Sequence, residues 1–112
     1  MKRIVCLFVI LFFASATPLW GSVEKGVEAY ESENYKTAFE ILFPLAKQGD
    51  SRAQYYVGKM YYEGQAVPQD RTAAVGWFRK SALQGDPYGE NALGVCYSYG
   101  RGVEKDVVVA AQ

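Results

Sequence analysis

The stretch YYVGKMYYEGQAVPQD, from Tyr55 to Asp70, decides the fold because a second stretch, NALGVCYSYGRGVEKD from Asn91 to Asp106, repeats its spacing. A shift of 36 residues superimposes glycines, a tyrosine, a valine and an aspartate: Gly58 on Gly94, Tyr61 on Tyr97, Gly64 on Gly100, Val67 on Val103 and Asp70 on Asp106. The same shift places AKQGD (46–50) on ALQGD (82–86). A fixed period of this length is typical of a solenoid of stacked supersecondary units.

Each unit is predicted to be a pair of helices, which makes the fold all-α. The period divides the chain into a half-unit at 23–50, a full unit at 51–86 and a truncated unit at 87–112. In the full unit, apolar residues recur at helical spacing over 51–63 and again over about 71–84. The predicted apolar face of the second helix consists of Ala74, Trp77, Phe78, Ser81 and Ala82.

Local signals mark where these helices begin and end. Asp70 and Asp86 each precede a predicted helix and are good N-caps. Gly64 and Gly85 suit the left-handed position that follows a helix. Gly58 lies in mid-helix, where glycine costs about 1 kcal/mol relative to alanine. We therefore expect the two helices of the unit to approach each other closely at Gly58.

These motifs resemble the Sel-1-like repeat, a relative of the tetratricopeptide repeat. The resemblance is carried by VGKMYYEGQAVPQD with Ala74, Trp77 and SALQGD, and then by LGVCYSYGRGVEKD with Ala110. It covers about residues 23–112 and implies a right-handed helix-pair solenoid of about two and a half repeats. Proteins similar to this family act as adaptors and scaffolds, and many bacterial ones are exported for envelope functions, signalling or host contact.

Two departures from the repeat pattern lead to expectations of their own. Ala66 occupies the second loop-glycine position, which Gly102 retains. If that position needs a positive φ, Ala66 carries about 1 kcal/mol of strain. The last unit stops at Gln112, one residue before its expected tryptophan, so Val107 and its neighbours would lack a covering helix. This predicts either a truncated reading frame or self-association that completes the core on another subunit.

The N-terminus is predicted to be a secretory signal peptide over residues 1–16, followed by a short linker at 17–22. Lys2 and Arg3 are a positive n-region, Ile4–Ala14 is an apolar h-region, and Ala14–Ala16 has the small residues of a cleavage site. The apolar run is shorter than the roughly 17–25 residues that span a bilayer, so an uncleaved anchor is the less favoured alternative. We expect a secreted or periplasmic protein with no membrane insertion after cleavage.

The composition argues against nucleic-acid binding, against nucleophilic catalysis that needs histidine, and against a metal site. The 12 basic and 12 acidic residues balance, which does not favour nucleic acid as a partner. There is no histidine, so Ser-His and Cys-His nucleophile pairs are excluded, and no Cys/His cluster has metal-ligand spacing. Cleavage would leave Cys96 as the single cysteine, which we expect to be buried and unable to form an internal disulfide. The chain is predicted to be no enzyme and to need no cofactor.

A stripe on the first helices of the units is the remaining candidate site. First helices line the concave side of stacked helix pairs. The stripe consists of Tyr55, Lys59 and Tyr62, continued one repeat later by Asn91, Val95 and Ser98. Exposed tyrosines bring a large contact area at low entropic cost, so the stripe is predicted to bind another protein or a peptide. The alternative is that the tyrosines pack on the adjacent repeat or on the Tyr30–Tyr35 segment.

Three functions remain open from the sequence. The first is an exported adaptor that binds an envelope or host protein through its concave face. The second is a structural or non-functional fragment of a truncated repeat protein. The third is an envelope enzyme or a peptidoglycan-binding protein, which has the least support because histidine and paired cysteines are missing from the predicted mature chain.

Overall fold

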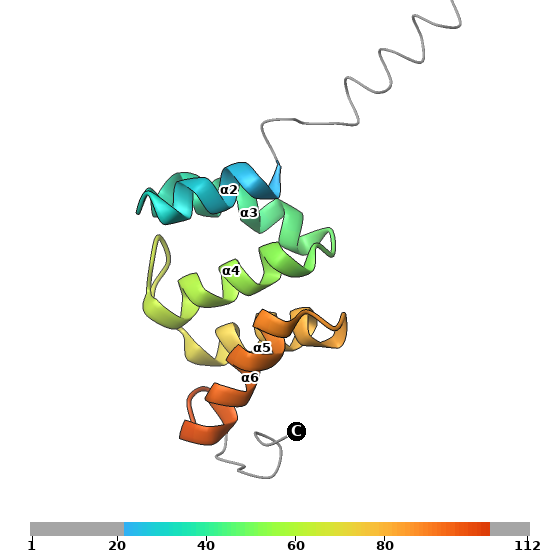
Figure 1. Ribbon diagram of the computed structural model, residues 1–112. Helices are drawn as coiled ribbons and strands as arrows, with labels where there is room; N and C mark the ends of the chain where they lie inside the picture. Colours follow the sequence, from blue (N-terminus) through green and yellow to red (C-terminus); the bar gives the residue numbers. More distant parts are fainter. Residues whose placement is uncertain (1–21, 104–112) are drawn as a thin grey trace, which may run out of the picture.

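The computed structural model describes residues 22–103, which form five α-helices and contain no strand. The helices are α2 (Val23–Glu31), α3 (Tyr35–Lys47), α4 (Ser51–Glu63), α5 (Arg71–Leu83) and α6 (Pro87–Tyr99). They stack as successive layers, with α2 and α3 at one end and α6 at the other (Figure 1). The predicted all-α helix-pair solenoid is confirmed.

Aspartates and glycines set the ends of these helices as predicted. Asp50, Asp70 and Asp86 are the N-caps of α4, α5 and α6, and each carboxylate accepts a hydrogen bond of 2.8–3.0 Å from a backbone N–H of the first turn. Gly64 ends α4 with a φ of 75°, and Gly85 follows α5 with a φ of 81°. These local contacts satisfy backbone groups that a helix end otherwise leaves unpaired.

The helices of each pair meet at a glycine. A Cβ built on Gly58 in α4 would lie 2.5 Å from the ring of Phe78 in α5. The expected close approach at Gly58 is therefore confirmed. Gly26 in α2 faces Leu42 in α3 in the same way, a contact that the sequence did not predict.

The segment expected as a half-unit contains both α2 and α3, so it is a shortened helix pair. Its two helices are joined by the three residues 32–34, where the full unit has the seven-residue loop 64–70. The four missing residues put α2 out of the 36-residue register, which is why Gly26 corresponds to Gly58 at a shift of 32. In this seven-residue loop Ala66 has a φ of 66°, and Gly102, at the same position after α6, has a φ of 79°, as the repeat pattern suggested.

The core differs from the predicted one at Trp77. Trp77 is half-buried, and its ring meets that of Phe43 in the preceding pair, with centroids 5.8 Å apart. Phe78 is 3% exposed and Val75 is 2% exposed, so these residues fill the space between α4, α5 and α6. The larger indole therefore lies at the edge of the core, where it packs one repeat against the next.

Hydrogen bonds also link successive repeats at the turns. The side-chain amide of Gln84 donates to the Gly49 carbonyl at 2.8 Å and to the Gln54 side chain at 2.9 Å. The Ser51 hydroxyl donates to the Asp86 carboxylate at 3.1 Å. The two QGD motifs, at 48–50 and 84–86, therefore do more than end and start helices. Hydrogen bonds join the second motif to the first motif and to the residue that follows it.

Several sequence-based predictions lie outside the described residues. They are the signal peptide at 1–16, nearly all of the linker at 17–22, and the end of the truncated unit with its predicted self-association. Of the linker, Ser22 is described, and its hydroxyl accepts from the Lys25 N–H at the start of α2. Within residues 22–103, none of the helices has the length and apolar character needed to cross a membrane.

Candidate protein-binding groove

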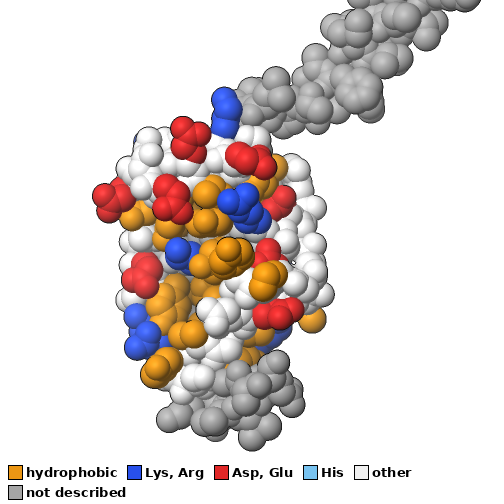
Figure 2. Space-filling model, in the orientation of Figure 1, with side chains coloured by type: hydrophobic (Ala, Val, Ile, Leu, Met, Phe, Trp, Pro, Cys, Tyr) orange, Lys and Arg blue, Asp and Glu red, His pale blue; other side chains and the backbone are white. Residues whose placement is uncertain are grey.

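The first helices of the successive pairs lie side by side, because α2 contacts α4 and α4 contacts α6. Between α4 and α6 lies a groove of about 290 Å³, which we call the α4–α6 groove. It is lined by Tyr55, Lys59, Tyr62, Glu63, Phe78, Asn91, Ala92, Val95, Cys96 and Arg101. Figure 2 shows hydrophobic side chains gathered over α4 and α6, with basic side chains among them.

Five of the six residues predicted for the binding stripe meet in this groove. Tyr55, Lys59 and Tyr62 come from α4, and Asn91 and Val95 come from α6. Ser98 does not line the groove and is half-buried on α6. Two neighbouring first helices thus build one surface, as the helical spacing of the stripe suggested.

The groove has an aromatic wall. The rings of Tyr55 and Tyr62 both lie near that of Phe78, with centroid distances of 6.1 and 6.4 Å. The ring centroid of Tyr55 also lies 5.5 Å from that of Tyr88 in α6. Tyr55 therefore packs on the adjacent repeat, which was the alternative to a free binding surface. Both groove tyrosines are half-buried, which leaves part of each side chain available to a ligand.

Lys59 is held by aromatic rings. Its ammonium lies 4.9 Å from the ring centroid of Tyr30 and 5.5 Å from those of Tyr55 and Tyr56. Each contact of this kind is worth about 0.5–1 kcal/mol at an exposed site. The rings therefore position the cation at the groove without cancelling its charge.

Arg101 is a groove residue that sequence reasoning missed. It follows α6, and its guanidinium donates to the Tyr62 hydroxyl across the groove. In the preceding repeat the Tyr30 hydroxyl bonds to the Gln65 side chain at 3.0 Å. Gln65 and Arg101 are 36 residues apart, so the signal was a recurring loop position. The 36-residue shift does not reveal the pairing, because the tyrosine partners, Tyr30 and Tyr62, are only 32 residues apart.

Cys96 closes the bottom of the groove. It is 1% exposed and packs with Ala74, Val75 and Phe78, as predicted for a core cysteine. Burial raises the pKa of the Cys96 thiol above its ordinary value, although Arg101 and Arg71 act in the opposite direction. The protonated thiol is thus favoured, and Cys96 serves as a small apolar side chain.

Comparison with known proteins identifies the family of this chain. The model of the Sel1 repeat matches residues 51–86 and 87–112, which together are more than half of the chain. The chain belongs to the Sel1 repeat family. The matched segments contain the α4, α5 and α6 helices that build the groove.

Two curated relatives are much longer than this Sel1 repeat chain. The sel1-like repeat-containing protein L18 of Acanthamoeba polyphaga mimivirus is 38% identical over 73% of the chain and 13% of its own length. The ERAD-associated E3 ubiquitin-protein ligase component HRD3A of Arabidopsis thaliana is 37% identical over 57% of the chain and 10% of its own length. The chain thus spans about a tenth of each relative.

Solved structures of other Sel1 repeat proteins have the same architecture. A Sel1 repeat protein from Oxalobacter formigenes superimposes with a TM-score of 0.75 at 31% identity, covering 79% of this chain and 35% of its own. The protective antigen c5321 of uropathogenic Escherichia coli also gives 0.75, at 34% identity, covering 79% of this chain and 20% of its own. Sel1 repeat proteins generally mediate protein–protein interactions and are scaffold modules rather than typical enzymes.

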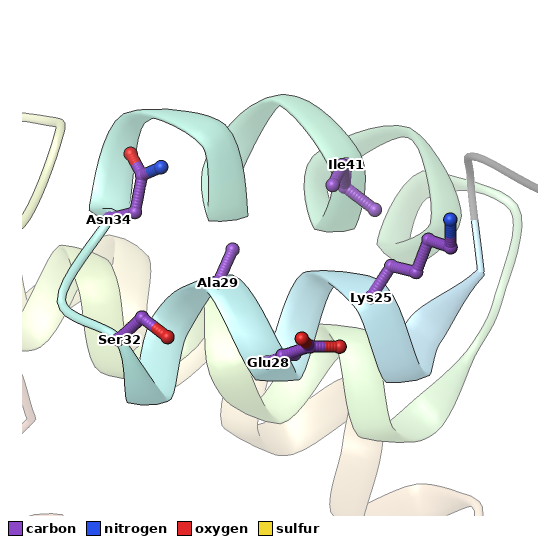
Figure 3. Close-up of a pocket in the computed structure, with 6 residues that line it drawn as sticks. All are labelled: Lys25, Glu28, Ala29, Ser32, Asn34 and Ile41. Carbon is purple, nitrogen blue, oxygen red and sulfur yellow. The ribbon is translucent and has the colours of Figure 1, made fainter.

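A second hollow lies between the two helices of the first pair. It measures about 340 Å³ and is lined by Lys25, Glu28, Ala29, Ser32, Asn34 and Ile41. Figure 3 shows the side chains of Ala29 and Ile41 pointing into the space between α2 and α3. Its lining lacks the aromatic side chains of the α4–α6 groove, and no group of metal-binding side chains occurs anywhere in residues 22–103.

Proposed function

We propose that this Sel1 repeat chain is an exported binding module that holds a segment of an envelope or host protein in the α4–α6 groove. The observation that carries the proposal is the meeting of Tyr55, Tyr62 and Val95 in one groove between two first helices. Aromatic side chains that are partly buried offer a large apolar surface with little entropy left to lose.

The relatives support a protein as the partner. HRD3A is a component of a ubiquitin-protein ligase, which is an assembly of proteins. The c5321 protein is a protective antigen of a uropathogenic bacterium, which supports host contact for this chain. Export is supported by the N-terminal sequence, with its basic start, its apolar run and the small residues up to Ala16.

Site-specific photocrosslinking in the native cell tests the binding function. A photoreactive benzoylphenylalanine replaces Val95, which lines the groove and is 38% exposed. The matched control carries it at Leu83, which is 81% exposed and does not line the groove. We expect a discrete crosslinked product from position 95 that Tyr62→Ala weakens. The absence of such a product, or the same product from position 83, would contradict the proposal.

Mass spectrometry of the protein recovered from cell fractions tests export. We expect the mature chain outside the cytoplasm to begin at Thr17, and Ala16→Lys to leave the precursor uncut because the cleavage site needs a small residue. A full-length chain in the cytoplasmic fraction would overturn export and leave the binding function to be judged by the crosslinks.

A further inference from the structure

The α4–α6 groove offers a ligand many hydrogen-bond donors, and positive charge gathers at one part of it. Among its described lining residues, Lys59 and Arg101 are cations and Glu63 is the single carboxylate. Arg71 adds a third positive charge near Tyr62, since its guanidinium lies 4.5 Å from the ring centroid of Tyr62. The negative charges of Asp86 and Glu31 act on Tyr55, two turns earlier on α4, so the positive charge is concentrated near Tyr62. A ligand that matches this surface brings acceptors and negative charge.

The charges of Lys59 and Arg101 are available to such a ligand. Lys59 contacts neutral tyrosine rings. Arg101 donates to the neutral Tyr62 hydroxyl, and its guanidinium lies 5.0 Å from the ring of Tyr99. A guanidinium has five N–H donors, and the side-chain hydrogen bond of Arg101 within residues 22–103 goes to Tyr62. Arg101 is exposed, and its guanidinium can therefore reach a bound molecule.

The base of the groove is apolar and therefore favours an apolar group of the ligand. Phe78 and Cys96 are 3% and 1% exposed, and they form a buried apolar base. Val95 lines the same groove and is 38% exposed. An apolar side chain placed against Val95 would remove this surface from water, which favours binding.

We propose that the α4–α6 groove binds a short peptide segment in which an apolar side chain is flanked by Asp or Glu. The apolar side chain packs on Val95 and the half-buried ring of Tyr62, and the flanking carboxylate accepts hydrogen bonds from Arg101 and Lys59. Asn91 can both donate to and accept from the peptide backbone. This inference rests on the proposed function and names the chemistry of the partner segment. The groove volume of about 290 Å³ suits a few side chains rather than a folded domain.

Selection from a random peptide library tests this inference. The library is displayed on phage and selected on the protein expressed as residues 1–112. Phage that also bind the Val95→Asp protein are removed, because that variant places a carboxylate in the groove. We expect the recovered peptides to be enriched in Asp or Glu next to an aromatic or aliphatic residue. Their affinity should fall as the salt concentration rises.

Charge variants then locate the contact. We expect Arg101→Gln and Lys59→Gln each to weaken binding of a selected peptide by about 3- to 10-fold, as for a charged pair at a partly exposed site. Lys36→Gln, on an exposed face of α3, removes the same charge away from the groove and should leave the affinity unchanged.

Three outcomes would overturn the inference. They are a selection that yields neutral or basic peptides, a polyglutamate peptide that binds as tightly as the selected ones, and a selection that yields no groove-dependent peptide. The second would show that charge attraction alone, to any polyanion, explains binding. If crosslinks form from position 95 but one of these three results is obtained, the proposed binding function stands and only the acidic-peptide inference fails. If no crosslinks form from position 95, the proposed binding function itself is contradicted.

Discussion

The ring of Phe78 in α5 occupies the space where a side chain on Gly58 in α4 would begin. A Cβ at Gly58 would lie 2.5 Å from the nearest ring carbon, whereas carbon atoms pack at about 3.5–4.0 Å. We expect Gly58→Ala to lower the free energy of unfolding by about 1–3 kcal/mol, because the helices must separate. Urea denaturation followed by circular dichroism measures the change.

Gly76 provides the matched control for this prediction. It also lies inside a helix, but a Cβ built on it would meet nothing within 4 Å. Gly76→Ala should therefore raise the free energy of unfolding by up to about 1 kcal/mol through helix propensity alone. If both variants were stabilised, packing against Phe78 would not be the reason for glycine at position 58.

Phe78 should contribute more to stability than the larger Trp77. Phe78 is 3% exposed, so Phe78→Ala is expected to cost about 3–5 kcal/mol. Trp77 is half-buried against Phe43, so Trp77→Ala is expected to cost about 2 kcal/mol, below the range for a fully buried aromatic. Chemical melts of the two variants give the order directly. A greater loss for Trp77→Ala would mean that packing between repeats contributes more to stability than packing around Phe78.

Ala66 is held in a backbone conformation that suits glycine. Its φ is 66°, and Gly102 has a φ of 79° at the equivalent loop position. Ala66→Gly should raise the free energy of unfolding by about 1 kcal/mol, because the left-handed region costs alanine about that much. Gly102→Ala is the reverse change and should destabilise, since its Cβ would also meet the Arg71 carbonyl. Thermal melts that show a loss for Ala66→Gly would mean that unfolded-chain entropy outweighs the strain.

Gln84 should stabilise the stack more than Gln48, its counterpart one repeat earlier. The Gln84 amide donates to the Gly49 carbonyl and to Gln54, which ties the second QGD motif to the first. Gln84→Ala is expected to cost about 1 kcal/mol, the typical net value of such a hydrogen bond. Both glutamines are exposed, but within residues 22–103 the side-chain bonds to a neighbouring repeat belong to Gln84, so Gln48→Ala should change stability by less than about 0.5 kcal/mol. Equal losses in denaturant melts would show that the bridge contributes nothing.

Tyr30 should make the protein less stable in alkali. Burial raises the pKa of Tyr30 to about 12 from its ordinary value near 10, although the hydrogen bond to Gln65 acts in the opposite direction. Below pH 10 the hydroxyl is protonated in both states, so Tyr30 adds no pH dependence. Between pH 10 and 12 the unfolded chain loses this proton while the folded chain keeps it, so the free energy of unfolding falls.

The variant Tyr30→Phe tests this assignment by denaturant melts at several alkaline pH values. We expect a shallower fall in stability above pH 10. Some fall should remain, because burial also raises the pKa of Tyr55. An unchanged slope in the Tyr30→Phe protein would show that Tyr30 titrates alike in both states.

Local interactions account for what could be predicted without a structure. Asp50, Asp70 and Asp86 start helices because a carboxylate bonds N–H groups two or three residues away. The strain at Ala66 and the glycine at position 58 could be inferred because the 36-residue period shows which residues share a role. Five of the six stripe residues meet in the groove for the same reason, since helical spacing places them on one face of α4 and α6.

The amino-acid sequence by itself therefore determined the period, the helices α4 and α5 with their ends, the start of α6 and the face that carries the candidate site. Only the tertiary structure decided that Phe78 rather than Trp77 fills the core, that Gly26 faces Leu42, and that Arg101 reaches Tyr62. These contacts join residues that are 16 to 39 positions apart. The Gly26–Leu42 contact depends on how the shortened first pair shifts α2 in register, and the other two depend on which side chains fit between α4, α5 and α6. Packing of this kind is set by three-dimensional shape, which local spacing does not encode.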